Sequence, residues 1–130
     1  MTMVGIGLDL IDLPRFEALY GARDPDVLAR CFTSQEIADV GDGEDGLARL
    51  AGRFAAKEAV LKLIGGLSDG MALTDIEVIV GPGGAPDVAL AGLARARADE
   101  RGIGRIHLSL THSAMAAAAV AIGVAGEMGK

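Results

Sequence analysis

The pattern of apolar residues predicts one long helix in the middle of the chain. Residues that favour helices, chiefly Ala, Leu, Lys and Arg, dominate Asp45–Ile64, and this stretch contains no proline. Asp45 suits the N-cap position, and Gly65 with Gly66 suits a C-terminal stop. Apolar side chains lie nearly all round the helical wheel, which is typical of a buried helix. We therefore expect the rest of the chain to pack around this segment.

Strict alternation of residue types predicts a strand at Met3–Ile11. One face carries Val4, Ile6, Leu8 and Leu10, and the other carries Gly5, Gly7, Asp9 and Ile11. Because glycine has no side chain, the second face leaves room for another backbone or a ligand near Asp9. Asp9 therefore has two open interpretations: a ligand-binding residue, or a strand-end residue that bonds a neighbouring turn.

Two hairpins are expected in the second half of the chain. The β-branched Asp75–Val80 is followed by a Gly- and Pro-rich turn and by the short segment Asp87–Leu90. Ile106–Thr111 alternates and precedes the alanine-rich Ala114–Ala125. Alanine favours helix, but Val, Ile and Val recur there at period two, so we expect a strand from about residue 117.

Short helices complete the predicted fold. Pro14, Asp24-Pro25 and the capping box Thr33–Glu36 mark the starts of three of them before the long helix. Ala91–Arg101 is expected to be a surface helix whose arginines (Arg95, Arg97 and Arg101) face solvent. One strand, several helices and then antiparallel strands predict an α+β fold, with one long central helix packed on a small, mainly antiparallel sheet. We expect residues 1–130 to form a single domain.

The composition narrows the class of protein. Of 130 residues, 51% are hydrophobic, which disfavours disorder, and no apolar run is long enough to span a membrane. The net charge of −6 and the 3% of aromatic residues argue against a nucleic-acid binder. The start of the chain lacks the basic region of a signal peptide, and the single Cys31 excludes an internal disulfide, so we expect a cytoplasmic protein. Zinc is disfavoured with one Cys and two His.

Charged residues interrupt the predicted central helix at Lys57, Glu58 and Lys62. A charge on a buried helix costs several kcal/mol unless it is paired, bound to a metal or facing a cleft. Glu58 and Lys62 are four residues apart and can form an ion pair. From spacing alone, a structural pair at the edge of the core and a functional site are about equally acceptable.

Three segments resemble the 4′-phosphopantetheinyl transferase family, in its short type. The run Gly52–Lys62, GRFAAKEAVLK, resembles the signature W/F-x-x-K-E-A/S-x-x-K. The segment Gly5–Leu10, followed by Arg15, resembles the family's G-x-D start. His107–Ser113, HLSLTHS, resembles the third motif, S-[IL]-[ST]-H-[ST]. The segments occur in the family's order, and the likeness covers nearly the whole chain.

The resemblance implies a reaction and a metal. Members move the phosphopantetheine arm of coenzyme A onto a serine of apo-acyl carrier protein and release adenosine 3′,5′-bisphosphate. Asp9 and Glu58 are expected to bind Mg²⁺, which takes one or two protein carboxylates together with waters and substrate phosphate. Lys62 is expected to neutralise a phosphate or the leaving group. Glu58 is favoured as the general base, directly or through a metal-bound water, but Asp9 stays an alternative.

Further contacts also follow from the resemblance. Arginine and lysine suit phosphate, so Arg53 and Lys57 are expected to hold the outer phosphate oxygens. Contacts to coenzyme A are expected at Gly65, Gly84, Pro86, His112 and Ser113. The family's G-K-P turn reads Gly84-Ala85-Pro86 here, so a cationic contact is absent. A lone His beside a turn, such as His112, is more often structural than catalytic.

Partners are also implied. The family uses active sites between the subunits of a homotrimer, and it docks its carrier protein on the first helix. Because carrier proteins are acidic and this chain is too, we expect a local basic patch at Arg15, Arg23 and Arg30. Two other classes are consistent with the same residues: a trimeric anion-binding scaffold, and a magnesium-dependent phosphohydrolase with the same carboxylates. The three ordered motifs favour the transferase.

Overall fold

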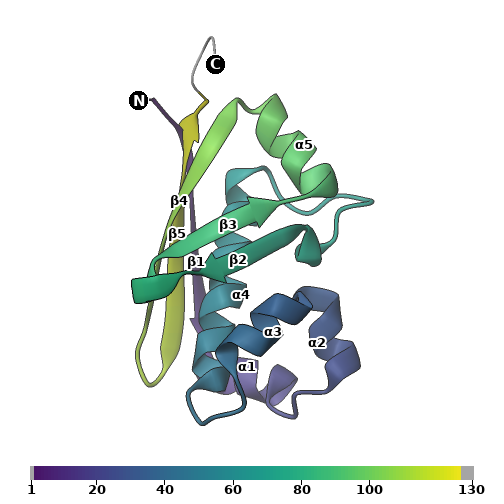
Figure 1. Cartoon of the computed structure of the whole chain (residues 1–130), viewed down its shortest axis with the longest axis vertical. Helices are drawn as coiled ribbons and strands as arrows, with labels where there is room; N and C mark the ends of the chain where they lie inside the picture. Colours follow the sequence, from purple (N-terminus) through teal and green to yellow (C-terminus); the bar gives the residue numbers. More distant parts are fainter. Residues whose placement is uncertain (1, 127–130) are drawn as a thin grey trace.

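A long helix, α4 (Gly46–Leu63), runs through the centre of the molecule between a three-stranded sheet and a layer of short helices (Figure 1). The computed structural model describes residues 2–126. The elements before α4 are β1 (Met3–Asp12), α1 (Leu13–Tyr20), α2 (Pro25–Cys31) and α3 (Ser34–Val40). Those after it are η1 (Leu73–Asp75), β2 (Ile76–Val80), η2 (Pro82–Gly84), β3 (Pro86–Leu90), α5 (Gly92–Glu100), β4 (Ile103–His112) and β5 (Ala116–Ala125). The predicted α+β class is confirmed.

The main sheet is antiparallel with the strand order β1-β5-β4. Leu8 pairs with Val120 between β1 and β5, and His107 pairs with Ile122 between β4 and β5. The alanine-rich C-terminal segment is therefore a strand, as its period-two pattern predicted, and it forms a hairpin with β4. Strand β4 begins at Ile103, three residues before the predicted start. Strands β2 and β3 form the second expected hairpin.

Strand β1 lies against α4 at a distance that only glycine permits. A Cβ atom on Gly7 would lie 1.9 Å from the carbonyl oxygen of Ala59. A Cβ atom on Gly5 would lie 3.0 Å from Cδ1 of Leu63. Since alternate residues of a strand share one face, Asp9 follows these glycines on the side facing α4. The close approach is what brings the Asp9 carboxylate to the central helix.

The ends of the short helices follow the expected capping chemistry. The Asp12 carboxylate accepts from the Arg15 backbone N–H at 3.0 Å and caps α1. Thr33 and Glu36 form the complete capping box at the start of α3. Asp45 occupies the N-cap position of α4, but its side chain makes no capping hydrogen bond. Helix α4 ends at Leu63, and Gly65 and Gly66 follow it with φ angles of 98° and 94°, which favour glycine.

The core has two parts. One fills the space between α4, the main sheet and the β2–β3 hairpin, and alanines of α4 and β5 let these layers approach closely. The other lies under α1, α2 and α3. It contains all four aromatic residues of the sequence, and the ring centroids of its contacting pairs lie 4.7 to 6.4 Å apart. The few aromatic residues are therefore concentrated beneath the first three helices.

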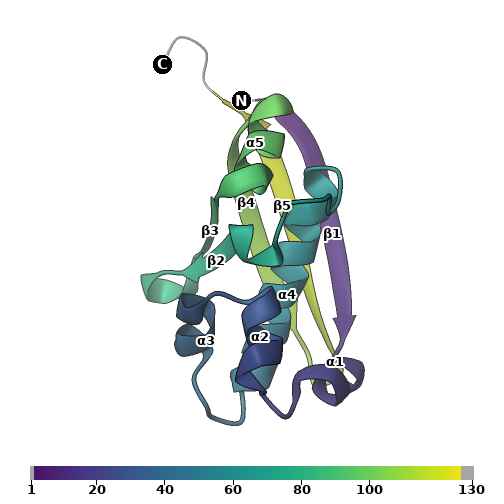
Figure 2. The same ribbon diagram turned by 90° about the vertical axis from the view of Figure 1, so that its right-hand side faces the viewer.

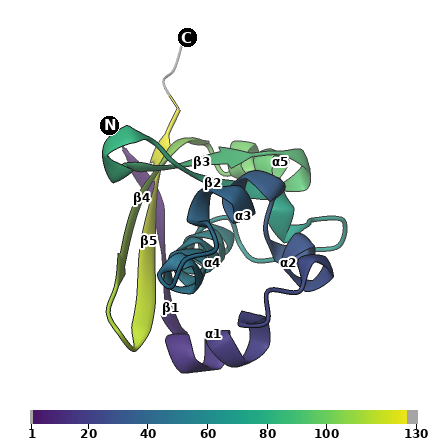
Figure 3. The same ribbon diagram turned by 60° about the horizontal axis from the view of Figure 1, so that its bottom comes forward.

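The helices lie on one side of the main sheet, so the other face of β1 is uncovered (Figures 2 and 3). Its outward side chains are apolar, with Leu8 64% exposed and Leu10 71% exposed. Ile6 continues this row, and the neighbouring β5 residues Val120 and Ile122 are partly buried. We refer to these five residues as the outer apolar face. Within residues 2–126, no helix is long and apolar enough to cross a membrane.

Candidate active site

The N-terminal strand and the central helix meet at Asp9 and Lys62. The Nζ atom of Lys62 donates to Oδ1 of Asp9 at 3.0 Å and to the Leu8 carbonyl oxygen at 2.8 Å. The Asp9 side chain is only 14% exposed, whereas that of Lys62 is 55% exposed. Glu58 and Lys62, whose spacing permits an ion pair, do not form one in the described structure, because the Lys62 ammonium bonds across to β1. This contact joins two of the three residues expected to be catalytic.

Glu58 lies one helical turn before Lys62, half-buried beside the same strand. Burial raises the pKa of the Glu58 carboxyl, and the negative charge of Asp9 raises it further, while Lys62 acts in the opposite direction. Asp9, Glu58 and Lys62 therefore form one interacting group from two elements. We call these three residues the charged triad.

The two carboxylates have the chemistry of a magnesium site. The Oδ2 atom of Asp9 is buried and has no hydrogen-bond partner among the described residues. A buried carboxylate oxygen is costly without a partner, and a cation satisfies it. No cluster of three or more His, Cys, Asp or Glu side chains occurs in residues 2–126. Mg²⁺ needs only one or two protein carboxylates when waters and substrate phosphate complete its shell, so Asp9 and Glu58 fit this ion.

A cleft of about 540 Å³ opens beside the triad. Glu58 and Lys62 line it together with Arg30 of α2. Its remaining lining is mainly apolar and comes from α4 and from the segment that leads into η1: Phe54, Leu61, Leu67, Met71 and Leu73. The cleft can therefore hold a molecule that has both anionic and apolar parts.

Lys57 lies outside the cleft, which corrects its expected role. Its side chain is 0% exposed, and its ammonium group bonds Glu36 of α3 and the Ile76 carbonyl oxygen of β2. Burial lowers the pKa of Lys57, and the Glu36 hydrogen bond and charge partly offset this effect. Consecutive residues of a helix point about 100° apart, so Lys57 faces the core while Glu58 faces the cleft. Lys57 cannot reach an outer phosphate oxygen from this position.

Arg53 is also largely buried, and it lies one turn before Lys57. One of its guanidinium nitrogens donates to the Arg49 carbonyl oxygen at 3.2 Å. Its Nε atom is buried and has no partner among the described residues. Arg53 does not line the cleft, so its contact with phosphate stays a prediction.

Of the other expected coenzyme A contacts, four lie away from the cleft of this chain and one, Gly65, lies beside it. Gly65 adjoins the cleft residue Gly66 at the end of α4. Gly84 and Pro86 lie at the β2–β3 turn. His112 and Ser113 lie at the β4–β5 turn, where the Ser113 hydroxyl accepts from the backbone N–H groups of residues 115 and 116. Neither turn lines the cleft, so contacts from these four residues need a second subunit or a larger site.

The three arginines expected to bind the partner differ in their surroundings. Arg15 lines a second hollow, about 280 Å³, which also contains Leu10, Leu19 and Phe54. Arg30 lines the main cleft. Arg23 bonds the Gly41 carbonyl oxygen at 2.7 Å and lies 3.8 Å from Asp42, so it holds the loop before α4. Phe54 lines both hollows, so the hollow at α1 and the cleft share one lining residue.

Two contributing residues, Arg97 and Glu36, were not predicted from the sequence. Arg97 of α5, expected to face solvent, donates to the Ile64 carbonyl oxygen at 3.2 Å and to the Ser68 hydroxyl at 2.8 Å. It thereby holds the segment that borders the cleft. Glu36 was recognised only as a capping residue. The capping box was its local signal, but its buried partner Lys57 is 21 positions away and could not be predicted from spacing.

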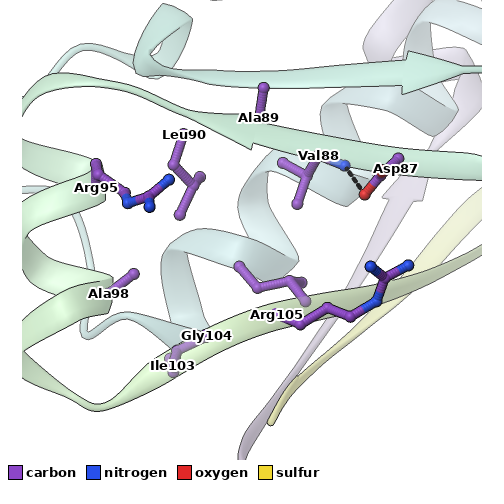
Figure 4. A pocket seen from close by; sticks show the side chains of 10 residues that line it. Asp87, Val88, Ala89, Leu90, Arg95, Ala98, Ile103, Gly104 and Arg105 are labelled. Carbon is purple, nitrogen blue, oxygen red and sulfur yellow. Dashed lines mark hydrogen bonds between the residues drawn. The ribbon is translucent and has the colours of Figure 1, made fainter. Parts of the chain in front are cut away.

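A third hollow, about 300 Å³, lies between β3, α5 and β4 (Figure 4). Arg95, Arg105 and Asp87 are its charged lining residues. Arg95 is paired with Asp99 at 3.3 Å. None of the expected site residues lines this hollow.

The fold and the charged triad define a class of enzyme. Residues 5–121 match the 4′-phosphopantetheinyl transferase superfamily, and the chain belongs to this family. It is 41% identical over 122 residues to the holo-[acyl-carrier-protein] synthase of Streptomyces coelicolor, covering 94% of this chain and 98% of the relative. The crystal structure of the Neisseria meningitidis holo-[acyl-carrier-protein] synthase superposes with a TM-score of 0.82 at 26% identity, covering 95% and 99% of the two chains.

A third similar protein has been solved with coenzyme A. The Helicobacter pylori holo-[acyl-carrier-protein] synthase in complex with coenzyme A superposes with a TM-score of 0.78 at 28% identity, covering 92% of this chain and 99% of that one.

Proposed function

We propose that this chain acts as a holo-[acyl-carrier-protein] synthase, moving the phosphopantetheine arm of coenzyme A onto a serine of apo-acyl carrier protein. The observation that carries the proposal is the charged triad, in which Asp9 and Lys62 meet at 3.0 Å with Glu58 beside them on the cleft. Relatives about 40% identical over nearly their whole length carry this name, and one solved neighbour binds coenzyme A.

Asp9 and Glu58 are the proposed ligands of Mg²⁺. The unpartnered Oδ2 atom of Asp9 supports this assignment, as does the nearby Glu58 carboxylate, whose raised pKa reflects burial and the charge of Asp9. When bound, Mg²⁺ neutralises charge on the phosphate oxygens of the substrate. The two carboxylates come from different elements, so the fold must be complete before the ion can bind.

The reaction is a displacement at phosphorus. The serine oxygen of the carrier protein bonds the phosphorus that bears the pantetheine arm. The bond from this phosphorus to the bridging pyrophosphate oxygen breaks, and adenosine 3′,5′-bisphosphate leaves. Such a transfer depends mainly on positioning and on charge stabilisation. Lys62, with its half-exposed ammonium group, is suited to neutralise the phosphate or the leaving group.

Glu58 is the favoured acceptor of the serine proton. A carboxylate is a better base at neutral pH when its pKa is raised, and burial and Asp9 both raise the pKa of Glu58. Asp9 stays an alternative, but its Oδ1 atom is already engaged by Lys62. The apolar lining of the cleft suits the pantetheine arm, while Arg30 and Lys62 suit its phosphate.

We propose that the carrier protein docks on α1. The hollow lined by Arg15 and Leu19 combines a cation with an exposed apolar side chain and reaches Phe54 at the cleft. An acidic helix that places apolar residues against this surface would bring its serine towards the triad. Arg30 extends the basic patch, whereas Arg23 is occupied by its own loop.

We further propose a homotrimer that covers the outer apolar face. This face leaves large apolar side chains of β1 in solvent, which is unusual for a monomer of this size. The number of subunits rests on the family resemblance. Assembly would also account for the turns containing Gly84, Pro86, His112 and Ser113, because a neighbouring subunit could present them to the cleft.

A direct assay tests the proposed reaction. The protein is mixed with Mg²⁺, coenzyme A and apo-acyl carrier protein, and intact-mass spectrometry follows the carrier. We expect the carrier mass to rise by one phosphopantetheine arm and adenosine 3′,5′-bisphosphate to appear in equal amount. A carrier with its serine replaced by alanine is the matched control. Release of adenosine bisphosphate at the same rate without an acceptor would instead identify a hydrolase.

A further inference from the structure

A second charged network is buried about 100° round α4 from Glu58, and it joins three elements. Oε1 of Glu36 accepts from the Lys57 ammonium and from the Thr33 backbone N–H at 2.8 Å. Oε2 of the same carboxylate accepts from the Val78 backbone N–H at 2.7 Å. Lys57 also donates to the Ile76 carbonyl oxygen. Through this one ion pair, α3 and β2 are both bonded to the central helix.

Both side chains of the pair are 0% exposed, so neither has access to substrate. The Lys57 ammonium also lies 5.7 Å from the centroid of the Phe32 ring, at the end of α2, so an aromatic ring covers that side of the ion pair. The carboxylate oxygens and the ammonium all have partners, so the network is satisfied without a ligand. Its residues therefore have no catalytic contact.

The position of the network on α4 relates it to the triad. Lys57 directly precedes Glu58, so the helix fixes the angle between the directions of their side chains at about 100°. On the sheet side, the contact of Gly7 with Ala59 sets the separation of α4 from β1. On the other side, the Glu36–Lys57 pair fixes the rotation of the same helical turn against α3 and β2. The helical turn that carries Glu58 is thus contacted by β1 through Ala59 and by α3 and β2 through Lys57.

We propose that Glu36 is a positioning residue for the transferase reaction: through Lys57 it sets the orientation in which α4 presents Glu58 to Asp9. This inference rests on the proposed function and deepens it. A hydrophobic pair could fill the same space, but it could not bond the backbone groups of Thr33, Val78 and Ile76. The ion pair is therefore suited to fix one rotation of α4, whereas apolar packing would permit several.

The test uses the full-length protein with Glu36→Asp, which keeps the charge but shortens the side chain by one methylene. The assay measures kcat, the KM values for coenzyme A and carrier protein, and the Mg²⁺ concentration that gives half-maximal rate. We expect kcat to fall at least 10-fold and the Mg²⁺ midpoint to rise several-fold. The KM for the carrier should stay within two-fold, because the docking surface on α1 does not contact Glu36.

A matched control separates positioning from stability. Ile103→Val removes one buried methylene outside the triad and the cleft, and it is expected to lower the melting temperature while leaving kcat and the Mg²⁺ midpoint unchanged. All rates are expressed per folded molecule, from circular dichroism at the assay temperature. Wild-type kcat and Mg²⁺ midpoint in folded Glu36→Asp would overturn the inference and show a purely stabilising role.

A second variant covers the case in which Glu36→Asp does not fold. Glu36→Gln with Lys57→Met removes both charges and retains most of the volume. A folded double variant with slow turnover and a raised Mg²⁺ midpoint supports positioning, and one with wild-type values contradicts it. The wild-type assay is independent of both variants. If wild type transfers no arm, the proposed function fails, whereas an active wild type with fully active variants refutes only the positioning role.

Discussion

Lys62 and Asp9 form an ion pair of 3.0 Å across 53 positions of sequence. Since Lys62 is a helix residue and Asp9 a strand residue, the pair exists only when β1 lies against α4. The ammonium group engages one carboxylate oxygen and leaves the other buried without a partner in the described structure. The two carboxylate oxygens of Asp9 therefore differ: Oδ1 accepts a hydrogen bond from the Lys62 ammonium, and Oδ2 is available to bind a cation from solution.

Neutralising either proposed metal ligand should abolish transfer without unfolding the protein. In Asp9→Asn and Glu58→Gln we expect kcat to fall by about 10²–10⁴-fold, the range for losing an acid–base group or a metal ligand. Isothermal titration should also show weaker Mg²⁺ binding. Glu44→Gln, in an exposed loop, is the control and should keep wild-type values. Near wild-type turnover in either variant would remove that residue from the site.

A side chain at Gly7 should displace β1 from α4. The added Cβ of Gly7→Ala would lie 1.9 Å from the Ala59 carbonyl oxygen, and a backbone atom cannot move aside cheaply. We expect a loss of about 1–3 kcal/mol or more in the free energy of unfolding, measured by urea denaturation, together with loss of activity.

Gly52→Ala is the matched control for this substitution. Its Cβ would lie 3.6 Å from Cδ2 of Leu110, an ordinary contact. Because alanine is favoured over glycine inside a helix, the variant should gain about 0.5–1 kcal/mol. Equal destabilisation at both positions would contradict the account of β1 packing.

Reversing the charge of Arg15 should weaken docking of the carrier protein. In Arg15→Glu we expect the carrier KM to rise about 10-fold while the KM for coenzyme A stays unchanged, since exposed charges act mainly on encounter with a charged partner. The difference should shrink as salt rises, because the Debye length is about 8 Å at physiological ionic strength. Arg95→Glu, on the far helix α5, is the control. Arg97 is unsuitable because it holds the segment bordering the cleft. An equal rise in both variants would show that net charge alone matters.

A charge on the outer apolar face should prevent assembly. We expect wild type to have three times the mass of one chain by light scattering, and Leu8→Lys to yield a folded, largely inactive monomer. Leu93→Lys, on α5, should remain trimeric. A fully active wild-type monomer would refute the proposed trimer and the shared active site.

The single tyrosine offers a direct check on the packing beneath α1. Burial raises the pKa of Tyr20 to about 12, and the Cys31 thiol, 3.7 Å from the hydroxyl, contributes to the rise. Because the folded state keeps its proton while the unfolded phenol titrates near pH 10, the contribution of Tyr20 to stability should fall between pH 10 and 12. With no tryptophan and one tyrosine, phenolate absorbance reports Tyr20 alone. A midpoint near 10 in the folded protein would contradict this environment.

Local patterns were sufficient to predict most of the secondary structure. The alternation of β1, the capping box of α3 and the glycines after α4 each depend on residues close in sequence, and all are confirmed. The partners of charged side chains were not predictable in this way. A helical wheel gives only the direction in which Lys57, Glu58 and Lys62 point from the helix axis. It does not reveal that Lys57 pairs with Glu36 or that Lys62 pairs with Asp9.

Arg97 illustrates the same limit. Its helix, α5, is polar, and this pattern predicts exposure to solvent. The end of α4 nevertheless packs against it, and the Ile64 carbonyl oxygen accepts a hydrogen bond from Arg97. The two residues in this contact are 33 positions apart in the sequence, so no pattern of neighbouring residues predicts it. The family resemblance named Asp9, Glu58 and Lys62, which the structure brings together, but it did not distinguish Lys62 at the cleft from Lys57 in the core.

The pairing of β1 with β5 has a consequence for biosynthesis. Met3 pairs with Val124, and Asp9 pairs with Ala119, so the first strand finds its place only beside the last one. A ribosome makes the two strands at opposite ends of the synthesis, and non-local pairing of this kind slows folding. The nascent chain can form α4 and the aromatic cluster early, but Asp9 must wait until the C-terminal strand has left the exit tunnel. We therefore expect the contact between Asp9 and Lys62 to form late in folding.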